Sequence, residues 1–148
     1  MKPRPTLVLD TNIWISAFLA HGPPSIIIQM AEEGLVQVFA SLEMLDEINR
    51  VLQYEKIVVI LKRSRTRSST VMGTIARLAS IVDVKTKVHV VEEDPSDNHV
   101  LACAKGTGAQ FIVSGDRHLL TLSRYGNARI VSASAFLQIQ GTRRRKKN

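Results

Sequence analysis

The chain has 148 residues, 45% of them hydrophobic, and a mean hydropathy close to zero. This size and composition fit one folded domain with a sizeable core and exclude a disordered chain. The formal net charge is +7, from 20 Lys and Arg against 13 Asp and Glu. Five of those cations occupy positions 143–147, which leaves 15 cations against 13 acids, or +2, for the rest of the chain.

No stretch of the sequence approaches the roughly 20 apolar residues that cross a bilayer. The segment from Met1 to Pro5 precedes a short apolar run that ends at Asp10, which makes a poor signal peptide. The single cysteine, Cys103, cannot form an internal disulfide, in agreement with a reducing compartment. We therefore expect a cytoplasmic protein without a membrane partner, with Cys103 as a small core residue on a helix.

In chain order, the first half predicts a buried strand at 6–9, where β-branched and apolar residues run together. The elements expected after it are a helix at 13–19 capped by Asn12, a helix at 25–31 capped by Ser25 and ended at Gly34, a strand at 36–40, and a strongly patterned helix from the cap Ser41 to about Gln53. Residues 57–80 indicate one or two helices with a basic cluster in their middle.

The second half predicts strands alternating with short helices. The expected elements are a strand at 81–84 that can extend toward Val91, a helix from Asp97 to Gly106 or Gly108, a strand at 111–114, a helix at 119–122, a strand at 130–131 and a helix at 134–139. Such alternation predicts an α/β/α sandwich in three layers, with a central parallel sheet of about five strands. We expect one domain at 1–140 and a disordered basic tail at 141–148.

Acidic residues follow or adjoin several of these strands. Asp10 ends the first strand, and Asp116 follows the fourth by two residues. Asp97 begins the helix that leads into that fourth strand. Ligands of parallel sheets bind beyond the carboxyl ends of the strands, where these loops gather. Carboxylates there can hold Mg²⁺ or Mn²⁺ for a hydrolytic displacement at phosphate.

Each of these three acids also has a purely structural interpretation. Asp10 can simply end its strand, and Asp97 can act only as a helix N-cap, the commonest role of Asp at a helix start. Asp116 can sit in an ordinary Gly-Asp turn. The four histidines are scattered without ligand spacing, so they are weaker candidates.

Glu47 lies at the edge of an apolar helical stripe formed by Leu45, Ile48 and Leu52. A carboxylate that is half inside a core boundary needs a partner, and a metal ion would serve. Small polar residues near the same edge of the sheet can orient ligands or waters, or can merely cap helices and end strands. They are Thr11, Asn12, Ser16 and Ser114.

Two basic clusters suit a polyanionic partner such as RNA, because every neutralised phosphate releases counterions. The alternative is a solvated face together with a disordered tail, and charge alone does not decide between them. The candidate RNA-binding residues are Lys62, Arg63, Arg65 and Arg67 in the middle of the chain and Arg143, Arg144 and Arg145 near its end.

Read together, these motifs resemble a PIN domain, in particular the small toxin components of prokaryotic toxin–antitoxin systems. The resemblance covers about residues 5–140, and its motifs stand in the family's order. The matching segments are 8–12, Ser16, 41–48, 94–98 and 112–116.

The resemblance implies a Mg²⁺- or Mn²⁺-dependent ribonuclease with an acidic site at Asp10, Glu47, Asp97 and Asp116. It assigns supporting roles to Asn12, Ser16 and Ser114, and Asp94 ranks below Asp97 as an extra acid. It also implies an antitoxin protein that covers the site, and a homodimer or a higher homo-oligomer. The basic clusters are not part of this pattern, which leaves open a growth-arresting toxin or a PIN nuclease with another duty.

The sequence therefore predicts a divalent-metal-dependent endoribonuclease, the toxin of a type II toxin–antitoxin system. The alternative is a catalytically silent PIN-type module that binds RNA or a partner protein. A phosphoryl-transfer or receiver-type domain that uses Asp10 fits poorly, because no second acid stands beside Asp10.

Overall fold

A central sheet organises the computed structural model, which describes residues 3–84 and 95–147. Its six strands lie in the order β3-β2-β1-β4-β6-β5. All neighbouring strands are parallel except β5, which runs antiparallel to β6. The strands are β1 (Thr6–Leu9), β2 (Gln37–Ser41), β3 (Ala79–Val82), β4 (Phe111–Val113), β5 (Arg124–Tyr125) and β6 (Ala128–Val131).

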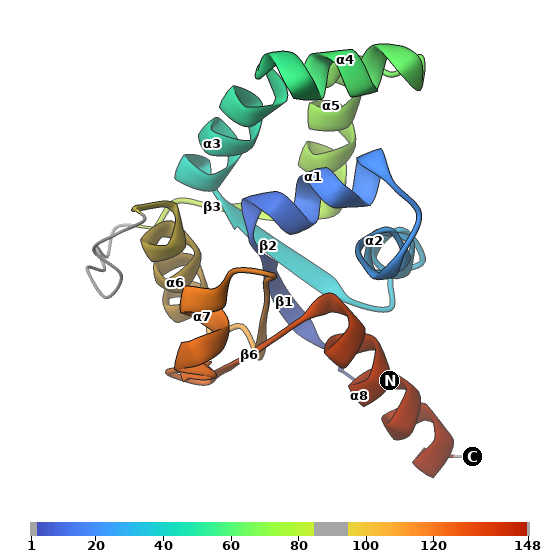
Figure 1. The fold of residues 1–148 in the computed structure, drawn as a ribbon. Helices are drawn as coiled ribbons and strands as arrows, with labels where there is room; N and C mark the ends of the chain where they lie inside the picture. Colours follow the sequence, from blue (N-terminus) through green and yellow to red (C-terminus); the bar gives the residue numbers. More distant parts are fainter. Residues whose placement is uncertain (1–2, 85–94, 148) are drawn as a thin grey trace.

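Helices cover both faces of this sheet (Figure 1). The helices are α1 (Thr11–Leu19), α2 (Pro23–Glu32), α3 (Leu42–Leu52), α4 (Glu55–Arg63), α5 (Ser68–Leu78), α6 (Pro95–Thr107), α7 (Arg117–Leu122) and α8 (Ala133–Lys147). The predicted three-layer α/β/α sandwich with a mainly parallel sheet is thus confirmed.

Alternate residues of the strands divide the interior into two cores. Leu7 and Leu9 of β1 join the larger core, which contains the fully buried Trp14 and Phe136. Val8, between them in sequence, joins a smaller core that α6 and α7 complete. Successive side chains of a strand point to opposite faces, so a strand buried on both sides reads as a continuous apolar run.

The strand order reverses direction next to β1. The chain proceeds outward from β1 to β2 and β3, then crosses back to place β4 on the other side of β1. Leu9 and Val113 are the last paired residues of β1 and β4, and the backbone N–H of Asp10 donates to the carbonyl of Val113 over 3.1 Å. The carboxyl ends of β1 and β4 therefore meet at the switch point of the sheet, the usual ligand position in such folds.

The predicted starts of α1, α2, α6 and α7 are two residues late, since α2 begins at Pro23 and α7 at Arg117. Asp10, rather than Asn12, is the N-cap of α1, because its carboxylate accepts the backbone N–H of Ile13. Asp and Asn cap equally well, and the chain turns into the helix directly after β1. Helix α6 begins at Pro95 instead of Asp97, which fits the preference of proline for a first helical position.

The sheet has six strands instead of about five, because the chain forms a short hairpin between β5 and β6. Strand β3 begins at Ala79, two residues before the predicted start, and the expected extension toward Val91 lies outside the described residues. The 57–80 segment forms two helices, α4 and α5. The break between them contains Arg65, whose φ of +55° is incompatible with a continuing helix.

Helix α8 continues to Lys147, well past the end expected at Ile139. Gln, Arg and Lys are good helix formers, and Gly141 alone does not end the helix. The backbone of 141–147 is therefore helical rather than the unstructured tail expected there, and the division of the chain at residue 140 stays a prediction. In the part of the chain that the structure describes, no single helix is long and apolar enough to cross a membrane; only α1 and α2 together reach that length, at 92° to each other.

Candidate active site

A small pocket of about 80 Å³ opens at the carboxyl ends of β1 and β4. All four carboxylates that the sequence singles out line this pocket, although they come from four separate parts of the chain. Among the residues that the structure describes, no Lys or Arg lines it. The lining residues are Asp10, Thr11, Asn12, Glu47, Val51, Asp97, Val100 and Asp116.

Asp10 lies at the floor of the site, with only 5% of its surface exposed. One carboxylate oxygen, Oδ1, accepts the backbone N–H of Ile13 over 2.8 Å, and Oδ2 accepts the hydroxyl of Ser114. Burial raises the pKa of Asp10 above its ordinary value, and the negative charge of Asp116 acts in the same direction. The hydrogen bonds from Ser114 and Ile13 oppose this shift because they stabilise the ionised form.

Ser114 connects two of the acids. Its side chain is fully buried, and while its hydroxyl donates to Asp10, its oxygen accepts the backbone N–H of Asp116 over 2.9 Å. A serine hydroxyl has one donor and two acceptor positions, so one side chain can satisfy both contacts. Ser114 thereby fixes the carboxylate of Asp10 relative to the start of α7. Ser114, one of the supporting residues expected from the sequence, thus contacts both Asp10 and the backbone of Asp116.

Asp116 is the N-cap of α7, where its Oδ1 accepts the backbone N–H of His118 over 2.7 Å. The imidazole of His118 lies close to the same carboxylate, with Nδ1 3.6 Å from Oδ1. Asp97, buried at 4% exposure, lies on the first turn of α6 across from them. Asp97, Asp116 and His118 can each offer one ligand atom such that these atoms all lie within 4.8 Å of one another.

The sequence pattern did not single out His118 as a ligand candidate. The four histidines have no mutual ligand spacing, and only the placement of His118 two residues after Asp116 at a strand exit could have indicated it. A helix N-terminus folds the chain back at this point, so that residues 116 and 118 approach the same position.

Glu47 reaches the pocket from the middle of α3 and is half-buried, as its position at the edge of the apolar stripe predicted. Its Oε2 accepts the hydroxyl of Thr11, a buried residue at the start of α1. The partner expected for this carboxylate is thus present in part as a neighbouring hydroxyl. Helix α3 buries Met44 fully, whereas Leu45 is only half-buried.

The remaining predicted residues differ in their position relative to the pocket. Asn12 is exposed and lines the pocket, whereas Ser16, one helical turn further along α1, is exposed but outside the pocket lining. Asp94 lies outside the described residues, as do the side chains of Arg143, Arg144 and Arg145. The middle cations Lys62, Arg63, Arg65 and Arg67 are exposed at the junction of α4 and α5, and none of them lines the pocket.

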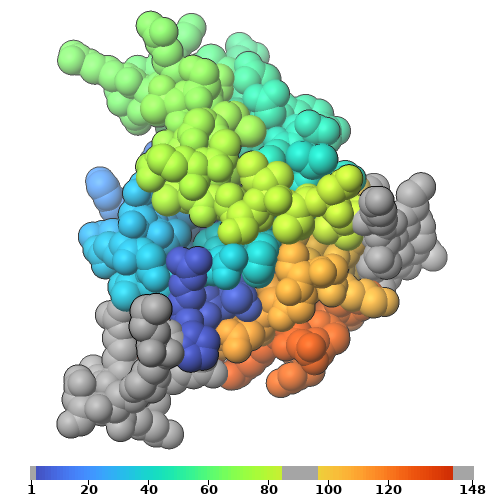
Figure 2. Space-filling model, turned by 180° about the vertical axis from the view of Figure 1, so that it is seen from behind, coloured from blue at the N-terminus to red at the C-terminus, as the bar shows by residue number. Residues whose placement is uncertain are grey.

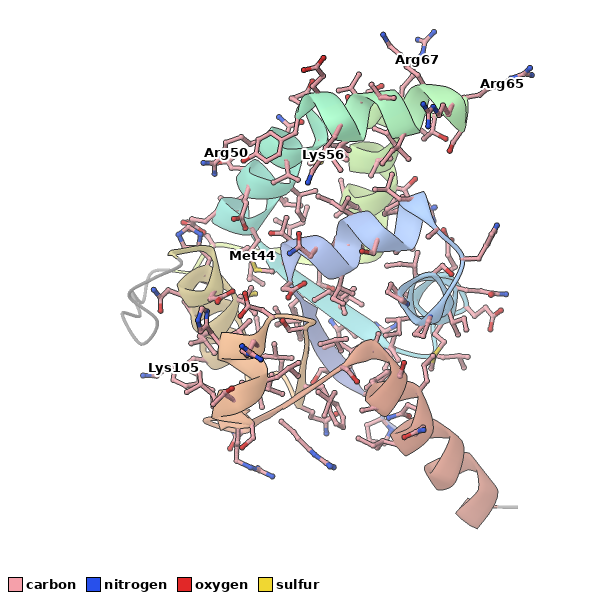
Figure 3. The ribbon with its side chains drawn as sticks, viewed as in Figure 1. Met44, Arg50, Lys56, Arg65, Arg67 and Lys105 are labelled. Atoms are coloured by element: carbon pink, nitrogen blue, oxygen red, sulfur yellow. The ribbon has the colours of Figure 1, made fainter. Side chains whose placement is uncertain are left out.

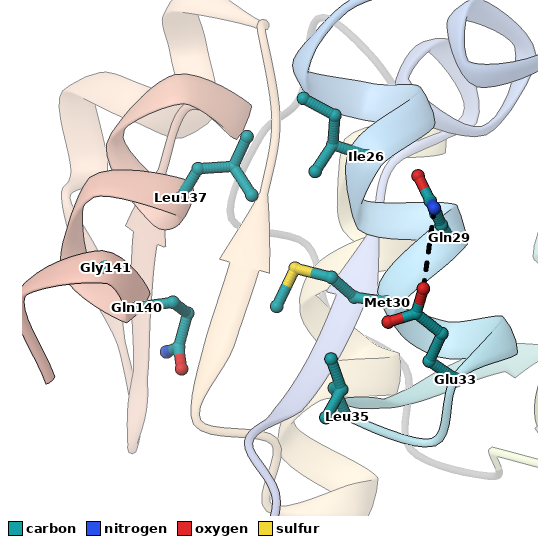
Figure 4. A pocket seen from close by; sticks show the side chains of 8 residues that line it. All are labelled: Ile26, Gln29, Met30, Glu33, Leu35, Leu137, Gln140 and Gly141. Atoms are coloured by element: carbon teal, nitrogen blue, oxygen red, sulfur yellow. Dashed lines mark hydrogen bonds between the residues drawn. The ribbon is translucent and has the colours of Figure 1, made fainter. Parts of the chain in front are cut away.

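A second pocket of about 270 Å³ lies between α2 and α8 (Figure 4). Apolar and amide side chains dominate it, and its one carboxylate, Glu33, accepts a hydrogen bond from Gln29 over 3.4 Å. This chemistry does not suit a hard cation, which prefers several oxygen ligands. The pocket is lined by Ile26, Gln29, Met30, Glu33, Leu35, Leu137, Gln140 and Gly141.

The architecture and the site together define an α/β protein with a nuclease-type fold and an acidic cluster that could bind a metal ion. A family model of the PIN domain matches residues 6–118, a segment that contains all four pocket carboxylates and His118. The chain belongs to the PIN domain family. PIN domains are generally nucleases that use divalent metals. None of the curated proteins compared with the chain matches it.

Proposed function

We propose that this protein is a divalent-metal-dependent endoribonuclease that hydrolyses RNA phosphodiester bonds. One observation carries the proposal: Asp10, Glu47, Asp97 and Asp116 line one pocket at the switch point of a parallel sheet. Nothing about the individual helices and strands requires four acids to meet there. Their convergence against mutual repulsion is a feature of sites built to hold cations.

The residues present fit a divalent metal ion. Asp10 and Asp97 are almost fully buried beside two further carboxylates, and none of the described residues that line the pocket is Lys or Arg. Ionised carboxylates that lie close together repel one another, and a bound cation offsets that repulsion. Carboxylate oxygens suit Mg²⁺ and Mn²⁺, and the nearby imidazole of His118 favours Mn²⁺ because nitrogen ligands suit transition metals better.

In this proposal Asp97 and Asp116, with Asp10 behind them, hold the ion, and His118 is a further ligand. A metal bound there would supply an activated water molecule and positive charge beside the scissile phosphate. Ser114 keeps Asp10 and the start of α7 in fixed relation, so that the ligand oxygens are arranged before a metal enters. Glu47, whose Oε2 accepts the hydroxyl of Thr11, lines the same pocket and would hold the ion or a water bound to it.

We further propose that the protein acts in the cytoplasm as the toxin of a type II toxin–antitoxin system. Its partners would be an antitoxin protein that covers the pocket and a second copy of the chain. The open rim of the pocket supports this, since Asn12 is exposed and Asp116 is partly exposed beside it. Either residue could be reached by a side chain from a partner protein.

Cleavage of a labelled single-stranded RNA by the purified chain tests the nuclease proposal. Cleavage should require Mg²⁺ or Mn²⁺, stop with EDTA, and vanish in an Asp116→Asn variant purified in parallel. Asp46→Asn, on the exposed face of the same helix as Glu47, is the matched control and should cleave normally. Equal cleavage by wild type and Asp116→Asn, or cleavage that persists in EDTA, would refute the mechanism.

Induced expression in a bacterial host tests the toxin role separately. Wild-type protein should arrest growth within one or two generations, whereas Asp116→Asn, expressed to the same level, should not. Normal growth with active, soluble wild-type enzyme would leave the nuclease intact and remove the toxin assignment.

A further inference from the structure

The hairpin formed by α4 and α5 has an unusual charge distribution. Between Glu55 and Asp83 the sequence contains no acidic residue, yet it contains six cations. Arg77 forms a bidentate ion pair with Glu32, at 2.8 and 3.0 Å. The ion pairs among the described residues include none of the other five: Lys56, Lys62, Arg63, Arg65 and Arg67.

The tip of the hairpin, defined here as residues 62–70, consists only of cations and hydroxyl-bearing residues. It holds four of the unpaired cations and five serines or threonines. The hairpin projects from the body of the molecule (Figure 2), and Arg65 and Arg67 extend outward from its end (Figure 3). Lysine, arginine, serine and threonine are the side chains that contact the phosphates and sugars of nucleic acids.

The backbone holds these cations in place. The N–H groups of Arg65 and Thr66 donate to the carbonyls of Lys62 and Leu61 over 3.1 and 2.9 Å, which closes the turn. Leu61 and Val71, one on each helix, are buried and anchor the hairpin to the larger core. Arg65 adopts a φ of +55°, a conformation that glycine would occupy with less strain. A charged side chain thus occupies a position that the turn alone would give to glycine.

The cations also continue toward the candidate active site. Arg50 is exposed on α3, one helical turn after Glu47, and Lys56 is exposed at the start of α4 (Figure 3). Lys56 and Arg63, seven positions apart, are separated by about 10 Å along the axis of α4. An RNA strand along this path would pass Arg50, then Lys56 beside the acidic Glu55, and then the four cations of the tip.

From these observations we propose that the α4–α5 hairpin is an arm that holds the phosphate backbone of single-stranded RNA outside the cleavage pocket. This inference rests on the proposed ribonuclease function, and it names the surface that retains the substrate. An acidic protein is a poorer fit at the tip, because protein interfaces place apolar residues at their centre and residues 62–70 contain none.

Fluorescence anisotropy with a labelled uridine-rich RNA of about 20 nucleotides, in EDTA so that no cleavage occurs, tests the arm. The arm variant combines Lys62→Gln, Arg63→Gln, Arg65→Gly and Arg67→Gln. The matched control removes four exposed cations that lie outside the hairpin: Arg4→Gln, Lys105→Gln, Arg124→Gln and Arg129→Gln.

Each lost phosphate contact should flatten the plot of log affinity against log salt by about 0.7 units. The arm variant should therefore lose about 2 to 3 units of slope and bind at least about tenfold more weakly at low salt, while the control changes little. Equal losses in both variants would mean that only net charge matters, and would overturn the proposal. If poly-glutamate at an equal concentration of charges displaces the RNA, the proposal that the arm binds nucleic acid rather than an acidic protein is overturned.

Two further measurements keep the result interpretable. Hydrolysis of a small chromogenic phosphodiester should be equal in wild type and arm variant, because the arm does not line the pocket. If the protein binds RNA through the arm but never cleaves it, the ribonuclease proposal is refuted. The arm then remains a surface that binds RNA. If the fourfold variant does not fold, the single variant Arg65→Gly replaces it. This variant should fold with an unchanged or higher melting temperature and should flatten the salt-dependence slope by about 0.7 units. An unchanged slope would count against the arm.

Discussion

The hydroxyl of Ser114 donates a hydrogen bond to the carboxylate of Asp10, a residue 104 positions away in the chain. The parallel pairing of β1 with β4 brings the two together, since each directly follows the last paired residue of its strand. The same serine oxygen accepts the N–H of Asp116. One buried hydroxyl therefore sets the relative positions of two proposed metal ligands.

Replacement of Ser114 by alanine should loosen this arrangement. Asp10 loses a donor and the N–H of Asp116 loses its acceptor, so the free energy of unfolding should fall by about 1 to 3 kcal/mol. Affinity for Mn²⁺, measured by titration calorimetry, should fall about tenfold or more. Ser134→Ala, an exposed change on α8, is the control. Unaltered Mn²⁺ affinity in a folded Ser114→Ala protein would show that the hydroxyl does not organise the ligands.

The pKa of Asp10 makes the stability of the metal-free protein depend on pH. Because burial raises this pKa, the folded state keeps a proton that the unfolded state has already released. The stabilisation from protonated Asp10 is complete below the ordinary pKa of 3.8 and is lost as pH rises through the folded value. Between the two values stability should fall by up to about 1.4 kcal/mol per pH unit.

Denaturant titrations of metal-free wild type and Asp10→Asn across this pH range measure the effect. Asparagine retains the helix cap but does not titrate, so the difference between the two proteins isolates Asp10. Wild type should lose stability relative to Asp10→Asn as pH rises. A difference that is constant with pH, or of the opposite sign, would contradict the raised pKa.

Asp116→Asn should abolish RNA cleavage and yet stabilise the metal-free protein. The substitution relieves repulsion with Asp10 and keeps the cap of α7, because Asn caps helices as well as Asp does. After screening by water and salt, the free energy of unfolding should rise by about 0.5 to 2 kcal/mol. The melting temperature should then be higher by several degrees. Added Mn²⁺ should stabilise wild type more than the variant. A lower melting temperature than wild type would instead indicate a structural role.

His118 should give the site a preference for Mn²⁺ over Mg²⁺. Its Nδ1 lies 3.6 Å from Asp116 Oδ1, and imidazole is a better ligand for Mn²⁺ than for Mg²⁺. His118→Gln should therefore weaken Mn²⁺ binding about tenfold or more and Mg²⁺ binding much less. Pulsed electron paramagnetic resonance of bound Mn²⁺ should show nitrogen coupling in wild type and in His21→Gln, and none in His118→Gln. Absence of that coupling from wild type would exclude His118 as a ligand.

Cys103 should be unreactive in the native protein. It is fully buried on α6, and burial raises the pKa of its thiol to about 12. At pH 8 almost no thiolate is present, and the thiolate is the reactive form. A chromogenic disulfide reagent should label one thiol per chain in denaturant and almost none without it. Rapid labelling of the folded protein would show that α6 opens readily.

Much of the molecule follows from the sequence alone, because the determinants are local. Continuous apolar runs such as residues 6–9 predict strands buried on both faces, and Ser41 caps its helix as predicted by accepting the N–H of Met44. The order of the acidic motifs along the chain indicated the PIN domain, and the position of Glu47 at the edge of an apolar stripe indicated its half-buried state.

Other features depend on contacts between distant parts of the chain. Ser114 meets Asp10 only because β4 pairs with β1, and Thr11 meets Glu47 only because α1 and α3 pack side by side. His118 approaches Asp97 only through the placement of α7 next to α6 at the edge of the sheet. The sequence determined which residues could ligate a metal, since that follows from residue type and local pattern. The tertiary structure decided which of them share one pocket, because strand pairing and helix packing set distances between residues that the chain itself separates.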